Sequence, residues 1–272
     1  MKQFIKRLGL GLIPKKSGPV AITLHHVDEK DFEWFGGILD TLSVDLDFMD
    51  PIEMEDTSNI ASNKILITFD DGFMVQKKLA DEVLAPRNIR AIFFIPTGFI
   101  GLSGEQAEKF AKTNFFPESN PPDLSPGSYD GMDWGDIRQL LDAGHSVGGH
   151  TLTHPNLNLL GADDLNHEIV SSADHLEDKL SITINQFAYP FGSLKQVDLA
   201  AVMQASARFD ICYSNIRGMI KESSGFHFIY RQNIVPGTPF WLVKASLEGR
   251  MDWWYKASRK KASSLARATI KI

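Results

Sequence analysis

The chain has 272 residues, of which 43% are hydrophobic and 23% are charged, and it contains one cysteine, Cys212. This composition is typical of a folded domain and excludes a disulfide-stapled scaffold or a cysteine-rich zinc module. A metal ion would therefore have to bind His, Asp or Glu side chains. The net charge of −6 argues against a nucleic-acid partner, because nucleic-acid-binding proteins usually present a basic surface.

The charge is unevenly distributed along the chain. Residues 1–16 carry +5, residues 17–249 carry −17 and residues 250–272 carry +6. We treat residues 1–17 as a basic N-terminal segment, whose apolar run is too short for a secretory signal. No window is apolar enough to span a membrane, so the sequence predicts a cytoplasmic protein.

Residues 241–272 are basic and contain three tryptophans, and we expect them to form a C-terminal helix. In one interpretation the helix packs its tryptophans on the domain. In the other, the basic ends of the chain attach it to the inner face of a membrane, because tryptophan and basic residues together are typical of interfacial helices. The oligomeric state is not predicted.

Short apolar runs alternate with helical patterns along the chain. Strands are expected at residues 20–24, 65–69, 91–95, 145–149, 186–189 and 209–213, and helices at 134–143, 163–180 and 195–207. Such alternation predicts an α/β fold, either a parallel sheet or a (β/α) barrel. We expect one domain over residues 18–240, in which residues 101–131 form a lid or a disordered loop, because they lack clear periodicity.

The first candidate cluster is Thr68-Phe-Asp-Asp-Gly72, at the end of a predicted strand. Two adjacent carboxylates at this position project in different directions, so Asp71 can bind a cation while Asp70 faces a substrate. The same residues are also typical of a helix N-cap followed by a turn.

The second candidate cluster is His150-Thr-Leu-Thr-His154, which follows Gly148-Gly149. Two imidazoles four residues apart reach one metal ion when the segment is a tight turn. Together with Asp71 they would form a site of two histidines and one carboxylate. Such a site serves either hydrolysis by an activated water or oxygen chemistry on ferrous iron, and Asp70 supplies the general base that only hydrolysis needs.

These two clusters, and Phe187-Ala-Tyr-Pro-Phe-Gly192, resemble three signature motifs of the polysaccharide deacetylases, carbohydrate esterase family 4. The resemblance covers residues 18–236 and implies a distorted (β/α) barrel. It also implies that the substrate is an acetylated poly- or oligosaccharide.

By the same resemblance, Asp71, His150 and His154 are metal ligands and Asp70 is the catalytic base. The implied cofactor is a divalent ion, zinc first, with cobalt, manganese or nickel as alternatives. A catalytically inactive carbohydrate-binding barrel and a ferrous oxygenase remain as other interpretations of the same residues.

The family's late Leu-x-His motif, which carries the general acid, is missing from this chain. Val20-Ala-Ile-Thr-Leu-His-His-Val27 resembles the N-terminal strand of a permuted branch in which that histidine takes over the acid role. We therefore expect His25 to be the acid, with His26 as the alternative.

The family's arginines in the third motif are also replaced, by Phe187 and Tyr189. We expect Arg231 to supply the missing positive charge at the base, or to form an ordinary surface ion pair. We expect three aromatic residues, Tyr189, Phe191 and Trp134, to contact the sugar, and we place Arg231 in the same substrate-binding group. Each of the three aromatic side chains is equally suited to the hydrophobic core.

Overall fold

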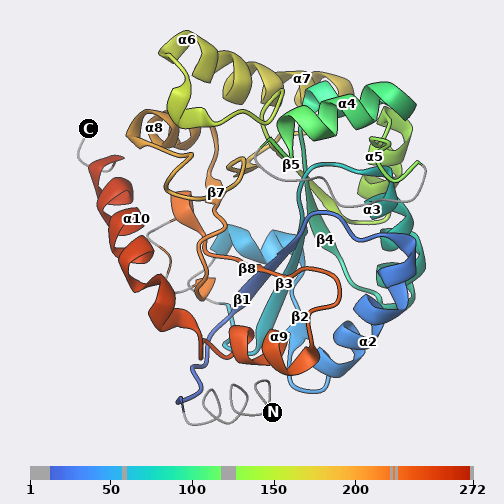
Figure 1. Ribbon diagram of the computed structural model, residues 1–272, viewed down its shortest axis with the longest axis vertical. Coiled ribbons are helices and arrows are strands. Elements are labelled where there is room, and N and C mark those ends of the chain that lie inside the picture. Colours follow the sequence, from blue (N-terminus) through green and yellow to red (C-terminus); the bar gives the residue numbers. More distant parts are fainter. Residues whose placement is uncertain (1–12, 57–59, 118–126, 221–222, 224–225, 270–272) are drawn as a thin grey trace.

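A computed structural model describes residues 13–56, 60–117, 127–220, 223 and 226–269. An eight-stranded parallel sheet, in the order β7-β6-β5-β4-β3-β1-β8 with β2 beside β3, curls into a distorted (β/α) barrel with helices outside it (Figure 1). The strands are β1 Val20–Leu24, β2 Asp47–Phe48, β3 Lys64–Phe69, β4 Ala91–Ile95, β5 Ser146–Gly149, β6 Gln186–Ala188, β7 Ile211–Tyr213 and β8 Gln232–Asn233.

The helices follow the strands around the outside of the barrel. They are α2 Phe32–Leu42, α3 Met74–Leu79, α4 Gly104–Asn114, α5 Trp134–Asp142, α6 Ala162–Leu165, α7 Ser172–Leu180, α8 Leu199–Arg208, α9 Phe240–Leu247 and α10 Lys256–Thr269. Two π-helical turns, Ala80–Leu84 and Asn166–Ser171, continue α3 and join α6 to α7. None of the helices within these described residues is both long and apolar enough to cross a membrane.

Residues 229–234 connect the two edges of the sheet. The Ile229 N–H donates to the Cys212 carbonyl at 2.8 Å, beside β7, and the Ile234 N–H donates to the Thr23 carbonyl at 3.0 Å, beside β1. Because this short segment contacts both β7 and β1, it brings Arg231 into the interior, close to the end of β3.

Side chains alternate between the two faces of the strands. In β3, Ile65, Ile67 and Phe69 pack toward the helices, whereas Leu66 belongs to a second apolar cluster on the other face. The period of two places Thr68 and Asp70 on the same inner face as Leu66. The fold thus directs the first of the two adjacent carboxylates into the barrel.

The predicted strands and helices are present, with shifts at their ends. Helix α8 begins at Leu199 instead of residue 195, because the Asp198 side chain caps it by accepting from the Ala201 N–H. The helix expected at 163–180 is interrupted by a π-helical turn at Asn166–Ser171. Helices α2 and α3 were not predicted.

Two expectations about irregular segments need correction. The stretch 101–131 is not structureless, since residues 104–114 form α4; residues 118–126 lie outside the described part. Residues 241–269 are not one helix, because the 3-10 turn Asp252–Tyr255 (η10) separates α9 from α10. Of the basic segment 1–17, residues 1–12 lie outside the described part.

Candidate active site

The adjacent carboxylates of Asp70 and Asp71 lie just beyond β3, at the carboxyl ends of the strands. Both residues are buried, with 1% and 3% of their surface exposed. Asp71 has a φ of 79° and Gly72 a φ of 73°, so the chain turns sharply between the two carboxylates and the next helix. This turn points Asp71 toward the imidazoles, while Asp70 continues the inner face of β3.

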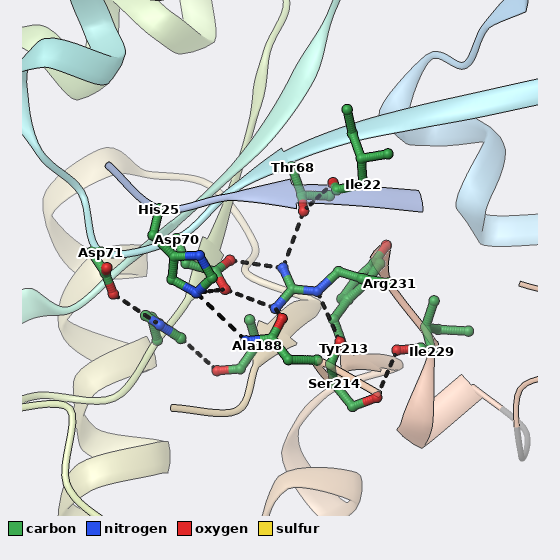
Figure 2. A network of polar contacts seen from close by, with 12 residues as sticks. Ile22, His25, Thr68, Asp70, Asp71, Ala188, Tyr213, Ser214, Ile229 and Arg231 are labelled. Carbon is green, nitrogen blue, oxygen red and sulfur yellow. Dashed lines mark hydrogen bonds and ion pairs between the residues drawn. The ribbon is translucent and has the colours of Figure 1, made fainter. Parts of the chain in front are cut away.

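Arg231 binds Asp70 through two parallel hydrogen bonds (Figure 2). Its Nη1 donates to Asp70 Oδ1 at 2.7 Å and its Nη2 donates to Asp70 Oδ2 at 2.8 Å. Arg231 is completely buried, and its guanidinium lies 5.5 and 5.8 Å from the ring centres of Phe94 and Tyr213. Its Nε also donates to the Ser214 carbonyl at 3.0 Å, which fixes the plane of the fork.

The pKa of Asp70 reflects two opposed effects. Burial raises the pKa of this carboxyl, but the charge of Arg231 and the nearby imidazoles of His150 and His25 outweigh burial and hold the pKa well below its usual range. Asp70 therefore stays ionised at ordinary pH. An ionised carboxylate with a free lone pair can accept a proton from a nearby water.

The imidazoles of His150 and His154 face Asp71. His150 Nδ1 donates to the Ala188 carbonyl at 2.7 Å, and His154 Nδ1 donates to the Asn114 carbonyl at 3.0 Å, because a carbonyl oxygen can only accept. When the ring proton is on Nδ1 alone, Nε2 of each ring directs its lone pair toward Asp71 Oδ1, which lies 3.6 Å from both Nε2 atoms.

These three side chains fit a divalent metal ion. Their ligand atoms all lie within 4.8 Å of one another, and Asp71 Oδ1 and His150 Nε2 are buried without a hydrogen-bond partner within the described part of the chain. A tetrahedral zinc ion about 2.1 Å from each ligand would separate them by about 3.4 Å, close to the observed 3.6 Å. Buried polar atoms without a partner are costly, and a bound ion would satisfy both.

The loop that carries the histidines is held in a strained conformation. Thr151 and His154 have φ values of 69° and 60°, and the His154 N–H donates to Thr151 Oγ1 at 2.9 Å. Glu168, in the π-helical turn, accepts from the Leu152 and Thr153 N–H groups at 2.9 and 2.8 Å. The motif alone did not point to Glu168, which anchors the loop from a neighbouring element.

His25 and His26 lie in different surroundings beyond β1. His25 Nε2 lies 3.6 Å from Asp70 Oδ2, and 29% of its side chain is exposed. His26 turns away, with Nε2 3.2 Å from the Ser128 carbonyl and its ring edge-on to Phe73. Burial lowers the pKa of His26. The structure therefore brings His25, and not His26, next to the expected base.

Asn215 completes this group and was missed in the sequence. Its Oδ1 accepts from Arg231 Nη2 at 3.2 Å, its Nδ2 donates to the Phe191 carbonyl at 3.2 Å, and Nδ2 lies 3.5 Å from His25 Nε2. Asn215 follows β7 by two residues, at the same edge of the barrel as the other site residues. A polar residue just beyond a predicted strand was the available signal.

Two of the residues expected to bind the sugar, Tyr189 and Arg231, are too buried to contact it. Tyr189 is fully buried and donates through its hydroxyl to the His227 carbonyl at 3.2 Å. Trp134 is partly exposed and packs edge-on against His175 of α7, with ring centres 5.5 Å apart, so its contact with sugar stays a prediction. Arg231 is too buried to touch a substrate, and for the same reason it is not a surface ion pair.

Phe191 is the expected sugar-binding residue that lies beside the histidines. Its ring centre is 4.5 Å from that of His154, and both residues line a cavity of about 410 Å³. The same cavity presents the polar side chains of Asn156 and Gln196. A mixed apolar and amide lining suits a neutral sugar.

The comparisons with known proteins agree with this architecture. A family model described as polysaccharide deacetylase matches residues 58–209. A peptidoglycan-N-acetylglucosamine deacetylase of Bacillus cereus is 25% identical over 138 residues, which cover 50% of this chain and 39% of that protein. The match therefore spans well under half of this relative.

Two solved structures share the fold at low sequence identity. The deacetylase PplD of Streptococcus pyogenes, in complex with acetate, is 19% identical with a TM-score of 0.64 over 86% of this chain and 99% of that one. IcaB from Ammonifex degensii is 20% identical with a TM-score of 0.68 over 87% and 99%.

Proposed function

We propose that this chain, which belongs to the polysaccharide deacetylase family, removes acetyl groups from a poly- or oligosaccharide by hydrolysis. N-acetyl groups are the first candidate. The observation that carries the proposal is the arrangement around Asp71. A buried carboxylate and two buried imidazoles bring their ligand atoms within 4.8 Å of one another, and the ion-paired Asp70 and the partly exposed His25 lie beside them.

Asp71, His150 and His154 would hold the metal ion, for which zinc is our first choice. A bound divalent ion lowers the pKa of a water molecule and polarises the acetyl carbonyl. Asp70 would accept the proton of the attacking water at Oδ2, which retains a lone pair although it accepts from Arg231. The fork of Arg231 prevents the carboxylate from rotating, so the accepting oxygen keeps its position.

His25 would protonate the departing amine. Its Nε2 is 3.6 Å from Asp70 Oδ2 and part of its ring is exposed, so one side chain can face both the base and a substrate. Without this proton the leaving group would be an amide anion, which is a poor one. Phe191 and the cavity beside His154 would hold sugar of the chain.

The decisive experiment is acetate release by chelated protein to which zinc is returned, with a panel of N-acetylated glycans as substrates. Asp70→Asn and His25→Ala should each lower turnover by about 100-fold or more, the usual contribution of a positioned acid or base. His26→Ala is the matched control and should keep most of its turnover. The reverse result for the two histidines would overturn the assignment of the acid.

Metal analysis separates the competing functions. A stoichiometric metal ion bound by the wild type and lost in Asp71→Asn, with no acetate from any glycan, would favour a carbohydrate-binding barrel. Oxygen consumption by iron-loaded Asp70→Asn protein would favour an oxygenase, because that chemistry does not need the base.

A further inference from the structure

Two tryptophans of the C-terminal segment are exposed and are not used by the proposed reaction. Trp253 and Trp254 lie in η10, where 59% and 53% of their surfaces are accessible, and their ring centres are 4.7 Å apart. They are the only adjacent pair among the large exposed hydrophobic side chains of the described residues. An exposed tryptophan pair on a folded domain usually marks a contact surface.

Helix α10 packs on the domain through small residues instead of these tryptophans. Ala262 and Ala266 are buried, with 0% and 4% exposed, on the side of the helix that contacts α8. Lys256, Lys260 and Arg267 are exposed and share another face, since they are four and seven residues apart. The structure therefore contradicts the interpretation in which the C-terminal tryptophans at 253 and 254 pack on the domain.

The acidic groups nearest this surface are already paired with bases. Asp252 is 3% exposed, and its Oδ2 accepts from Lys16 Nζ at 2.8 Å and from Arg259 Nη1 at 3.2 Å. Glu248 Oε2 accepts from Arg250 Nε at 2.6 Å. These acidic groups therefore do not neutralise the exposed basic side chains of α10.

We propose that Trp253, Trp254 and the basic face of α10 (Lys256, Lys260 and Arg267) form a docking surface for an anionic lipid bilayer. Tryptophan rings favour the boundary between headgroups and acyl chains, and basic side chains beside them bind anionic headgroups. The partner is a membrane surface because the patch combines exposed aromatic rings with uncompensated positive charge, which an anionic bilayer complements in both respects.

The tryptophan end of the docking surface lies at the opposite end of the barrel from the candidate active site. Asp252 contacts Lys16, four residues before β1 begins, whereas Asp70 and Asp71 follow the carboxyl end of β3, and β1 and β3 are parallel (Figure 1). Helix α10 then runs along the side of the barrel to α8, and Lys261 Nζ donates to the Leu194 carbonyl at 3.4 Å (Figure 1).

Vesicle co-sedimentation of the full chain tests the proposal. We expect binding to vesicles of phosphatidylcholine and phosphatidylglycerol that weakens with added salt, and much weaker binding to phosphatidylcholine alone. Neutralising two lysines in Lys256→Gln/Lys260→Gln should weaken binding about 30-fold, at the usual contribution of each basic residue near an anionic surface. The matched control Lys109→Gln/Lys179→Gln removes two exposed lysines from α4 and α7 and should not weaken binding.

The tryptophans are tested separately by their fluorescence. Mixed vesicles should shift the wild-type emission to shorter wavelength, and Trp253→Ser/Trp254→Ser should lose both the shift and the binding. Ile52→Ser, at a side chain that is 64% exposed elsewhere, is the control. Equal binding by variants and controls would overturn the proposal, as would wild-type self-association that Trp253→Ser/Trp254→Ser abolishes. None of these readouts depends on deacetylation, so their failure would leave the proposed function intact.

Discussion

Replacing Arg231 with methionine is expected to destabilise the fold strongly. Arg231 is fully buried and its two hydrogen bonds of 2.7 and 2.8 Å are to a carboxylate that is itself 1% exposed. Opposite charges about 4 Å apart attract by about 4 kcal/mol at an effective dielectric constant of 20, and breaking one partner of a buried pair costs about 3–5 kcal/mol. We expect the free energy of unfolding to fall by that amount and the melting temperature by about 6–10 °C.

A double-mutant cycle identifies the cause of this loss. Urea unfolding of metal-free protein is measured for Arg231→Met, Asp70→Asn and the double variant, followed by circular dichroism. Because the unpaired charge causes most of the loss, the double variant should be more stable than Arg231→Met alone. Additive losses, or a loss below about 1 kcal/mol in Arg231→Met, would refute the buried ion pair as a major interaction.

Three further changes test other parts of the structure. Burial lowers the pKa of His145 from 6.5 to about 4, so the unfolded chain takes up this proton first and the free energy of unfolding should fall as pH drops from 6.5 to 4. Urea unfolding of His145→Asn should show a smaller dependence of that free energy on pH. An unchanged dependence would contradict the assignment. Asn215→Ala should lower kcat for acetate release about 10- to 100-fold with little change in KM, since it contacts His25; an unchanged kcat would mean that His25 is held by other groups. Gly192→Ala should lower the melting temperature, because φ is 58° and the new Cβ would lie 2.4 Å from the Asn215 nitrogen; equal melting would show that the turn can relax.

The residues around the proposed metal could be predicted from the sequence because each lies in a short local motif. Asp70 and Asp71 follow an apolar run that ends in a turn, and His150 and His154 follow two glycines. In a barrel of parallel strands such segments meet at one end, so local patterns and topology together predict their proximity. His25 was expected instead from the resemblance of residues 20–27 to the N-terminal strand of a permuted branch of the family.

The remaining contacts depend on pairings that a local pattern does not contain. The Arg231–Asp70 bond joins residues 161 positions apart, and its geometry depends on how residues 229–234 cross between the edges of the sheet. Tyr189 was misassigned although a signal was present. It shares the alternation of Phe187, and both pack toward the helices while Ala188 faces the interior.

Backbone strain is concentrated at the candidate site. Within the described residues, six non-glycine residues have positive φ; Asn88 and Ser181 end helices, where this conformation is ordinary, and the others are Asp71, Thr151, His154 and Phe191.

Each such residue costs about 1–3 kcal/mol and persists only where its surroundings hold it in place. In this protein, Glu168 and Asn215 hold these residues in place. Glu168 accepts from the backbone of the histidine loop, and Asn215 donates to the Phe191 carbonyl. The side chains that would meet the ion and the sugar therefore depend on polar contacts from neighbouring elements, and a variant that relaxes this strain should gain stability while it loses the geometry that the proposed reaction needs.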